Sequence, residues 1–145
     1  MTVADWVQIG IAGTMLFWAT WQDIRDYTIP VLAILLGIVA GLGSAVAFHG
    51  WHGLEFAGIG GVLGGVLGGF LVRVVKLGEG DAALYLALGV ILGPVFLLSL
   101  FVWSNIFILM RFLIPILKKK RIRIAVAPYI LAATGMTAFL HIIGI

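Results

Sequence analysis

Long apolar runs, interrupted by only a few charges, constrain this chain more than any other feature of its sequence. Of its 145 residues, 63% are hydrophobic and 10% are charged, whereas a soluble domain carries about 25% charged residues. Such a chain has too little polar surface to cover itself in water. Backbone groups in hydrocarbon must bond within their own segment, so apolar runs form helices there. We therefore expect an all-α membrane protein.

Six apolar segments have the length, or nearly the length, of a membrane span, which needs about 20 residues. They are expected at 5–22, 29–48, 56–75, 82–93, 95–117 and 124–144. The fourth is short, and Gly93-Pro94 marks its end. A single kinked helix through Gly93 is the alternative, but it would be too long for one crossing. The sequence predicts one six-helix bundle over residues 1–145, forming a single domain.

The basic residues predict the orientation of this bundle. All nine lysines and arginines fall in or near the segments 23–28, 76–81 and 118–123. Short loops rich in lysine and arginine stay in the cytoplasm, so both termini are expected outside a plasma (inner) membrane. Asp5, and no basic residue, precedes the first segment. We expect that segment to be a retained helix and not a removable signal peptide.

The third segment carries glycines that recur every four residues and so fall on one helix face. Glycine lets the backbones of membrane helices approach closely. Helix packing is one interpretation of this stripe, and a surface for a substrate helix is another, with Gly37 and Gly41 offering similar contacts. The stripe consists of Gly60, Gly61, Gly64, Gly65, Gly68 and Gly69.

Two of the six acidic residues stand at helix ends on the same predicted side of the membrane. Asp23 ends the first segment, and Asp81 begins the fourth. An ionisable residue at such a boundary is costly and is a candidate for function. Two carboxyls held close together share a proton, so one can serve as base and the other as acid in aspartic-protease chemistry. The structural alternative for Asp81 is a helix N-cap.

The sequences around both aspartates resemble the type IV prepilin peptidase family, which are G-x-G-D intramembrane aspartyl proteases. Residues 23–30 read Asp-Ile-Arg-Asp-Tyr-Thr-Ile-Pro, and residues 78–84 read Gly-Glu-Gly-Asp-Ala-Ala-Leu. The resemblance implies that Asp23 and Asp81 are catalytic, because Asp23 and not Asp26 stands seven residues before the proline. The residues that it implies shape the site are Gly78, Gly80, Arg25 and Pro30.

The same resemblance implies the substrate and the form of the enzyme. Prepilin-like membrane proteins would be cleaved on the cytoplasmic side, with no cofactor and no metal. The chain is similar to the short form without a methyltransferase domain. It departs from the family pattern at Val31, where asparagine is frequent, and at Ala83, where lysine is frequent. Ala127-Pro128-Tyr129 resembles the start of the family's last helix.

Other interpretations remain open at this stage. A proton-coupled transporter also uses membrane aspartates, and a non-catalytic assembly subunit of pilus or secretion machinery could keep the same fold. His49 and His52, with Glu55 nearby, favour an interfacial loop over a metal site. Asp26 and Glu79 are expected to be solvated. No serine has a neighbouring His–Asp arrangement, no nucleic-acid surface is evident, and the sequence does not indicate an oligomeric state.

Overall fold

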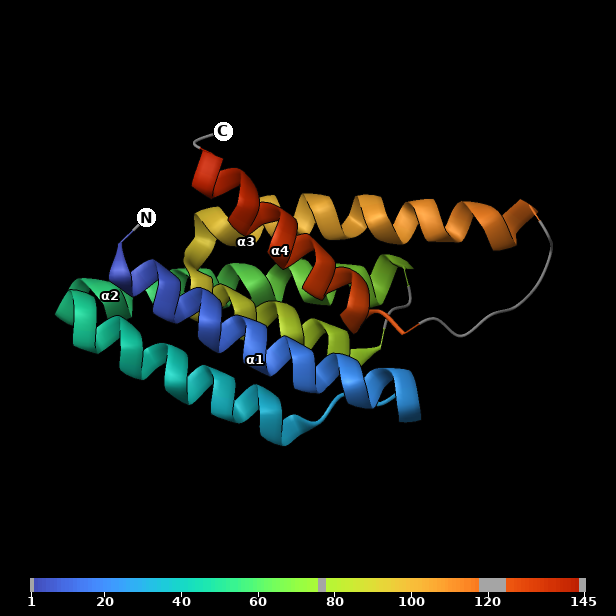
Figure 1. Ribbon diagram of the computed structural model, residues 1–145. Coiled ribbons are helices and arrows are strands. Elements are labelled where there is room, and N and C mark those ends of the chain that lie inside the picture. The colour runs from blue at the N-terminus through green and yellow to red at the C-terminus, as the bar shows by residue number, and fades with distance from the viewer. Residues whose placement is uncertain (1, 76–77, 118–124, 144–145) are drawn as a thin grey trace.

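Four helices build the chain in the computed structural model, which describes residues 2–75, 78–117 and 125–143 (Figure 1). The helices are α1 (Val3–Asp26), α2 (Val31–Val75), α3 (Glu79–Leu117) and α4 (Ala127–Ile143). No strand occurs in these ranges. The all-α prediction is confirmed.

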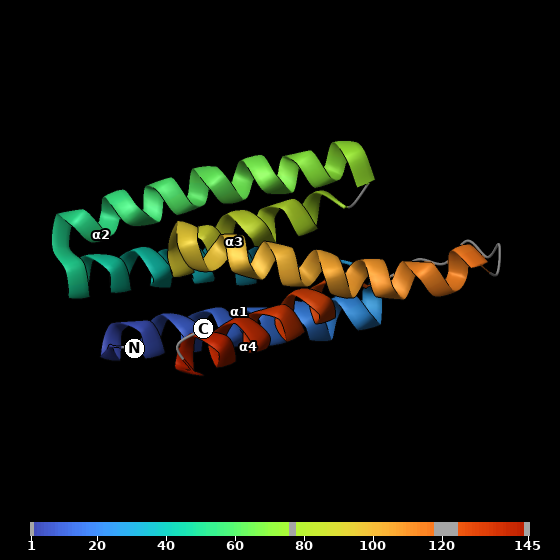
Figure 2. The same ribbon diagram turned by 90° about the horizontal axis from the view of Figure 1, so that it is seen from above.

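Two glycines break the two long helices. Gly50 in α2 has φ 58° and ψ −137°, and Gly93 in α3 has φ 77° and ψ 174°. Side chains other than hydrogen disfavour these angles, so glycine is needed at both positions. The chain folds back on itself at each break, and the four helices therefore provide six helical segments (Figures 1 and 2). The break at Gly93 coincides with the end expected for the fourth segment.

Several expected boundaries need correction. Residues 49–55, expected to form a loop, are helical on both sides of Gly50. The helix α1 is longer than expected at both ends. A capping box of Thr2 and Asp5 starts it, and Tyr27, with φ 52°, ends it after Asp26. The helix α3 begins at Glu79, so Asp81 lies in its first turn and is not the N-cap. The basic residues Lys76 and 118–123 lie outside the described residues.

The segments run lengthwise beside one another, which gives the bundle two distinct ends. The N-terminus, the breaks at Gly50 and Gly93, and the end of α4 lie at one end in both views (Figures 1 and 2). The end of α1, both ends of α2, and the starts of α3 and α4 lie at the other. We call this second end the connection end. Arg25 and Arg73 are exposed there.

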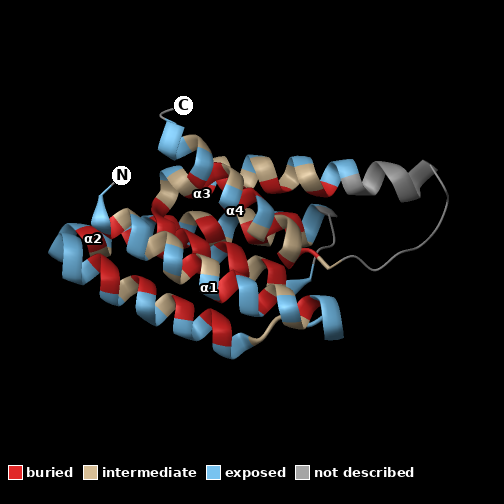
Figure 3. Ribbon diagram, viewed as in Figure 1, coloured by how far each residue is buried: buried red, intermediate tan, exposed pale blue. Residues whose placement is uncertain are grey.

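Exposed residues line the outer faces of the helices and buried residues their inner faces (Figure 3), and several polar residues are among the buried ones. Large apolar side chains are exposed along every helix, and α2 and α3 are long and apolar enough to cross a membrane. The exposed apolar surface suits a lipid surrounding, so a membrane location is plausible. The buried polar residues are Asp23, Ser44, Asp81, Ser104, Thr134 and Thr137.

The second segment of α2 packs directly on the first segment of α3. A Cβ atom at Gly60, Gly64 or Gly68 would overlap the α3 backbone of Gly89, Tyr85 or Ala82 respectively. Gly37 and Gly41 similarly face the side chains of Met15 and Ile91. These glycines therefore hold the bundle together, and the interpretation that they form a substrate surface does not apply to them.

A buried hydrogen bond links the two segments of α3 across the break at Gly93. The Tyr85 hydroxyl lies 2.6 Å from the Ser104 hydroxyl, and both residues are fully buried. The Ser104 hydroxyl also donates to the carbonyl of Phe101 at 3.0 Å. This bond fixes the first segment of α3, which carries Asp81 at its start.

Gly64→Ala is expected to destabilise the protein, because the added methyl group overlaps the carbonyl of Tyr85. Overpacking of this kind costs about 1–3 kcal/mol. Gly69→Ala on the same segment is the control, since nothing lies within 4 Å of its Cβ position. Thermal unfolding in detergent, followed by tryptophan fluorescence, measures both. Equal melting temperatures for the two variants would contradict the packing described here.

Ser104→Ala is expected to lower the melting temperature more than Tyr85→Phe. The serine variant leaves the buried Tyr85 hydroxyl without its partner, which costs about 1–3 kcal/mol. The tyrosine variant removes that hydroxyl, while Ser104 keeps its bond to the Phe101 carbonyl, so about 1 kcal/mol is lost. The reverse order in the same unfolding assay would show that this hydrogen bond does not decide stability.

Candidate active site

Asp23 lies in the last turn of α1, with only 6% of its surface exposed. Its Oδ2 atom accepts a hydrogen bond of 3.0 Å from the backbone N–H of Ala127, the first residue of α4. The backbone of Val126 also hydrogen-bonds this carboxyl. The end of the first helix is thereby joined to the start of the last one.

Asp81 lies in the first turn of α3, with 8% of its surface exposed. Its backbone N–H donates to the carbonyl of Gly78 at 3.1 Å, and its carboxyl receives a backbone hydrogen bond from Gly78. An acidic side chain in the first turn commonly satisfies the free amides of a helix start. Asp81 can therefore serve this helix start from the third helical position, although it is not the N-cap residue that the sequence predicted.

The negative charge of Asp23 acts on Asp81. Burial raises the pKa of Asp23, although the hydrogen bonds from Ala127 and Val126 partly oppose this rise. Burial, followed by the negative charge of Asp23, raises the pKa of Asp81 to about 6. Both residues lie just outside the segments 5–22 and 82–93 expected to span the membrane. The structure therefore brings Asp23 and Asp81 into one coupled pair at the connection end.

The Ile29-Pro30 pair and the second glycine of the Gly78–Asp81 segment meet in space. The carbonyl of Pro30 accepts the N–H of Ala33 at 3.1 Å, so Pro30 caps the start of α2. The side chain of Ile29 lies 3.1 Å from the position that a Cβ at Gly80 would take. Glycine at position 80 therefore lets the α1–α2 connection approach the start of α3, which explains why both motifs accompany the aspartates.

The remaining predicted site residues have different surroundings. Gly78 is exposed, and a Cβ there would lie 3.5 Å from Oδ2 of Asp81. Arg25 is exposed and forms no ion pair with any residue that the structure describes. Asp26 and Glu79 are exposed, as expected. Arg25 therefore does not belong to the buried pair.

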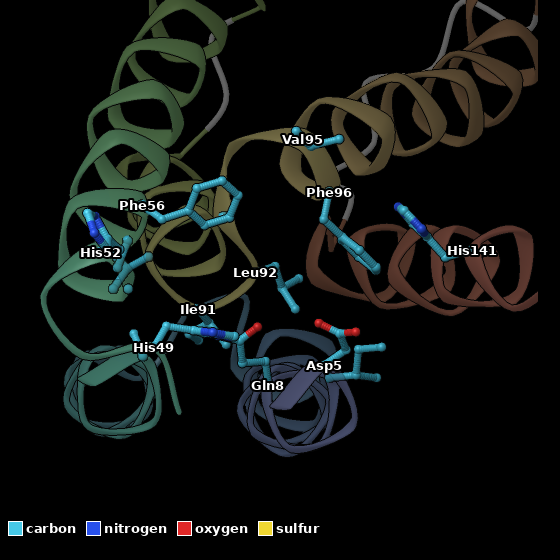
Figure 4. A pocket seen from close by; sticks show the side chains of 16 residues that line it. Asp5, Gln8, His49, His52, Phe56, Ile91, Leu92, Val95, Phe96 and His141 are labelled. Carbon is cyan, nitrogen blue, oxygen red and sulfur yellow. The ribbon is translucent and has the colours of Figure 1, made fainter. Parts of the chain in front are cut away.

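The histidines lie at the opposite end of the bundle, around a cavity of about 430 Å³ (Figure 4). His49, His52 and His141 contribute to its wall together with Asp5. Asp5 and Asp23 are 18 residues apart on α1, which corresponds to about 27 Å along a helix. No cluster of three or more His, Asp or Glu side chains that could hold a metal occurs among the described residues. The cavity is therefore separate from Asp23 and Asp81.

The start of α4 is the part of the site that sequence reasoning did not find. Ala127-Pro128 was identified only by its resemblance to a helix start. No Ser, Thr, Asp or Asn stands at the start of α4. A buried helix start without such a cap residue needs a hydrogen-bond acceptor from another part of the chain, so this absence could have indicated a contact. That signal does not indicate which acidic residue would serve.

Asp81→Asn is expected to raise the melting temperature at about pH 8 and to have little effect at about pH 4. The folded protein holds a proton on Asp81 up to about pH 6, whereas an ordinary aspartate loses its proton at about pH 3.9. Wild-type stability therefore falls as the pH rises through this window, and asparagine avoids that loss. Asp26→Asn, at an exposed carboxyl, is the control. A gain that is independent of pH would contradict the burial of an ionising Asp81.

Comparison with known proteins places these residues in a family. A search of curated protein sequences and a search of solved structures gave no match. The family model of the type IV leader peptidases matches residues 10–114, which is more than half of the 145-residue chain. The match includes Asp23 and Asp81, and it ends before α4 begins. The chain belongs to the type IV leader peptidase family.

Proposed function

We propose that this protein is an aspartyl endopeptidase that removes leader peptides from type IV pilin-like precursors. One observation carries the proposal. Asp23 and Asp81, on different helices, are both buried at the same end of the bundle, and the charge of one raises the pKa of the other. A coupled pair of buried carboxyls is the arrangement that aspartic proteases use, and the family supplies the substrate class.

The proposed reaction needs only the two carboxyls and water. One carboxylate takes a proton from water as the water oxygen attacks the peptide carbonyl carbon. The other carboxyl, still protonated, donates its proton to the carbonyl oxygen. The tetrahedral intermediate then collapses, the C–N bond breaks, and a proton passes to the leaving nitrogen. The products are a new carboxyl end on the leader and a new amino end on the mature protein.

The position of the pair suits this substrate class. We propose that the six helical segments cross the inner membrane with the connection end in the cytoplasm, because Arg25 and Arg73 are exposed there and the sequence predicts a cytoplasmic location for the segments that carry the other basic residues. Asp23 and Asp81 then lie near the cytoplasmic surface, where water is available. A precursor with a short basic leader followed by an apolar helix presents its cleavage site at the same depth.

A proton-coupled transporter is less well supported. Transporters bind their substrates and coupling ions near the middle of the membrane. Within the described part of the chain, the buried acidic residues are Asp23 and Asp81, and both lie within a turn of a helix end. Uptake into proteoliposomes that depends on Asp81, without any cleavage of precursors, would favour this alternative.

A non-catalytic assembly subunit of the same fold is the other alternative. It rests on Val31 and Ala83, where the sequence departs from the family. Val31 is exposed at the start of α2, and Ala83 is partly buried against the core. Neither residue provides a group on which the proposed proton transfers depend. A wild-type protein that binds precursors without cleaving them would support this alternative.

The central test is cleavage of a precursor by purified protein in detergent. Asp23→Asn and Asp81→Asn are each expected to reduce the cleavage rate by at least about 100-fold, since general acid and base catalysis contribute about 10²–10⁴-fold. Mass spectrometry of the new amino end measures the rate and the position of cleavage. Both variants should still insert into the membrane.

Asp26→Asn and Glu79→Gln are the matched controls for this test. Each removes an exposed carboxyl close in sequence to one member of the pair, and each should cleave at the wild-type rate. Wild-type rates from both Asp23→Asn and Asp81→Asn would disprove the assignment. A loss in the controls equal to that in the two test variants would show that net charge, and not the buried pair, determines activity.

A further inference from the structure

The helix α4 begins without a side-chain cap of its own. The carbonyl of Val126 accepts the first helical hydrogen bonds, from Tyr129 at 3.0 Å and Ile130 at 3.3 Å. Val126 is therefore the N-cap residue, and Ala127 is the first helical residue. A valine side chain has no acceptor for the free amides of a helix start, and both residues are buried away from water.

The Asp23 carboxylate fills this gap from a distant part of the chain. The Ala127 N–H points to its Oδ2 atom at 3.0 Å, although 104 residues separate the two. The backbone of Val126 also lowers the pKa of this carboxyl. Hydrogen bonds from amides at a helix start favour the ionised form of a carboxyl. The residues matched by the family model end before α4 begins. The evidence for this contact therefore comes from the structure of this chain and not from the family match.

The ionised form of Asp81 is less stable than that of Asp23. Among the described residues, Gly78 is the backbone hydrogen-bond partner of its carboxyl, and Asp81 also faces the charge of Asp23. The exposed fractions of the two side chains are nearly equal, at 6% for Asp23 and 8% for Asp81. Burial is the largest cause of both raised pKa values, and the amide hydrogen bond to Asp23 and the charge that Asp81 faces act with it in deciding which of them keeps the proton.

We propose that the start of α4 assigns the two roles: Asp23, held by the amides of Val126 and Ala127, is the base, and Asp81 is the acid. This inference rests on the proposed peptidase function. In the first step, Asp23 accepts a proton from water and Asp81 gives its proton to the peptide carbonyl oxygen. When the C–N bond breaks, the proton on Asp23 passes to the leaving nitrogen, and Asp81 recovers its own proton from the intermediate. Val126 and Ala127 act as positioning residues.

Other titratable groups at the connection end leave this division intact. Those at helix ends in the described residues are exposed or only partly buried, so solvent screens their charges. Tyr85, one turn after Asp81 on α3, is fully buried, and its hydroxyl lies 2.6 Å from that of Ser104. The shifts of Asp23 and Asp81 arise from burial, backbone hydrogen bonds and the pair itself. The other groups are Arg25 and Asp26 on α1, Arg73 on α2, Glu79 on α3 and Tyr129 on α4.

The test labels the folded protein in detergent with dicyclohexylcarbodiimide, which reacts with protonated carboxyls and is apolar enough to reach buried ones. Peptide mass spectrometry then locates the adducts. At about pH 8, well above the pKa of Asp81, Asp81 is expected to be labelled faster than Asp23, by about tenfold for each unit by which its pKa is the higher. Equal labelling, or faster labelling of Asp23, would overturn the assignment.

Ala127→Pro removes the amide that donates to Asp23, at the helical position where proline is best tolerated. Labelling of Asp23 is expected to rise, and the acidic limb of the cleavage profile should move to higher pH. Ala127→Gly is the matched control, because it loosens the helix start but keeps the N–H. Equal labelling of Asp23 in Ala127→Pro and Ala127→Gly would show that the hydrogen bond does not determine which carboxyl holds the proton.

The labelling experiment needs no substrate, so its failure differs from failure of the proposed function. Faster labelling of Asp81 in a protein that never cleaves precursors would keep the asymmetry of the pair and refute the peptidase. Cleavage that depends on both aspartates, together with faster labelling of Asp23, would keep the peptidase and refute the assignment of roles. A purely structural contact at Ala127 would lower stability without moving the pH profile.

Discussion

The contact between the backbones of α2 and α3 determines where the rest of the site lies. Gly60, Gly64 and Gly68 bring the second segment of α2 against α3 with no side chain between them. The first segment of α3 is thereby held inside the bundle, and Asp81 at its start is buried. Without this close approach, Asp81 would stand at a looser helix start, where water would lower its pKa toward the ordinary value.

Asp23 depends on a different set of contacts, which connect the two ends of the chain. The helix α1 ends at Tyr27 in a left-handed conformation, with the Tyr27 N–H bonded to the Asp23 carbonyl. The backbone of Asp23 therefore closes its own helix while its side chain caps the start of α4. One residue serves two helix ends. A substitution at this position has structural consequences as well as catalytic ones, which is why asparagine, which keeps an acceptor oxygen, is the informative change.

The sequence predicts the helices and the identity of the pair better than it predicts their contacts. The apolar runs predict the number of helical segments, because the bilayer allows few alternatives to helices. Gly93-Pro94 predicts the turn in α3. Hydropathy cannot distinguish a loop from a helix broken at one glycine, so residues 49–55 were misassigned. Spacing to Pro30 identifies Asp23, but contact with Ala127 depends on tertiary packing across 104 residues. Likewise, nothing local to Ser104 indicates that it bonds Tyr85.

Burial and helix geometry together explain how two similar carboxyls acquire different properties. Each lies near the start of a helix, where free amides stabilise negative charge. Asp81 lies in the first turn of α3 and receives its hydrogen bond from the exposed Gly78 of the same helix start. Asp23, in contrast, lies on α1 and accepts a hydrogen bond from a buried amide at the start of another helix, α4. Desolvation acts on both, so the pair cannot easily carry two charges, and the better hydrogen-bonded member ionises first. The asymmetry required for acid–base chemistry thus follows from which helix each carboxyl caps.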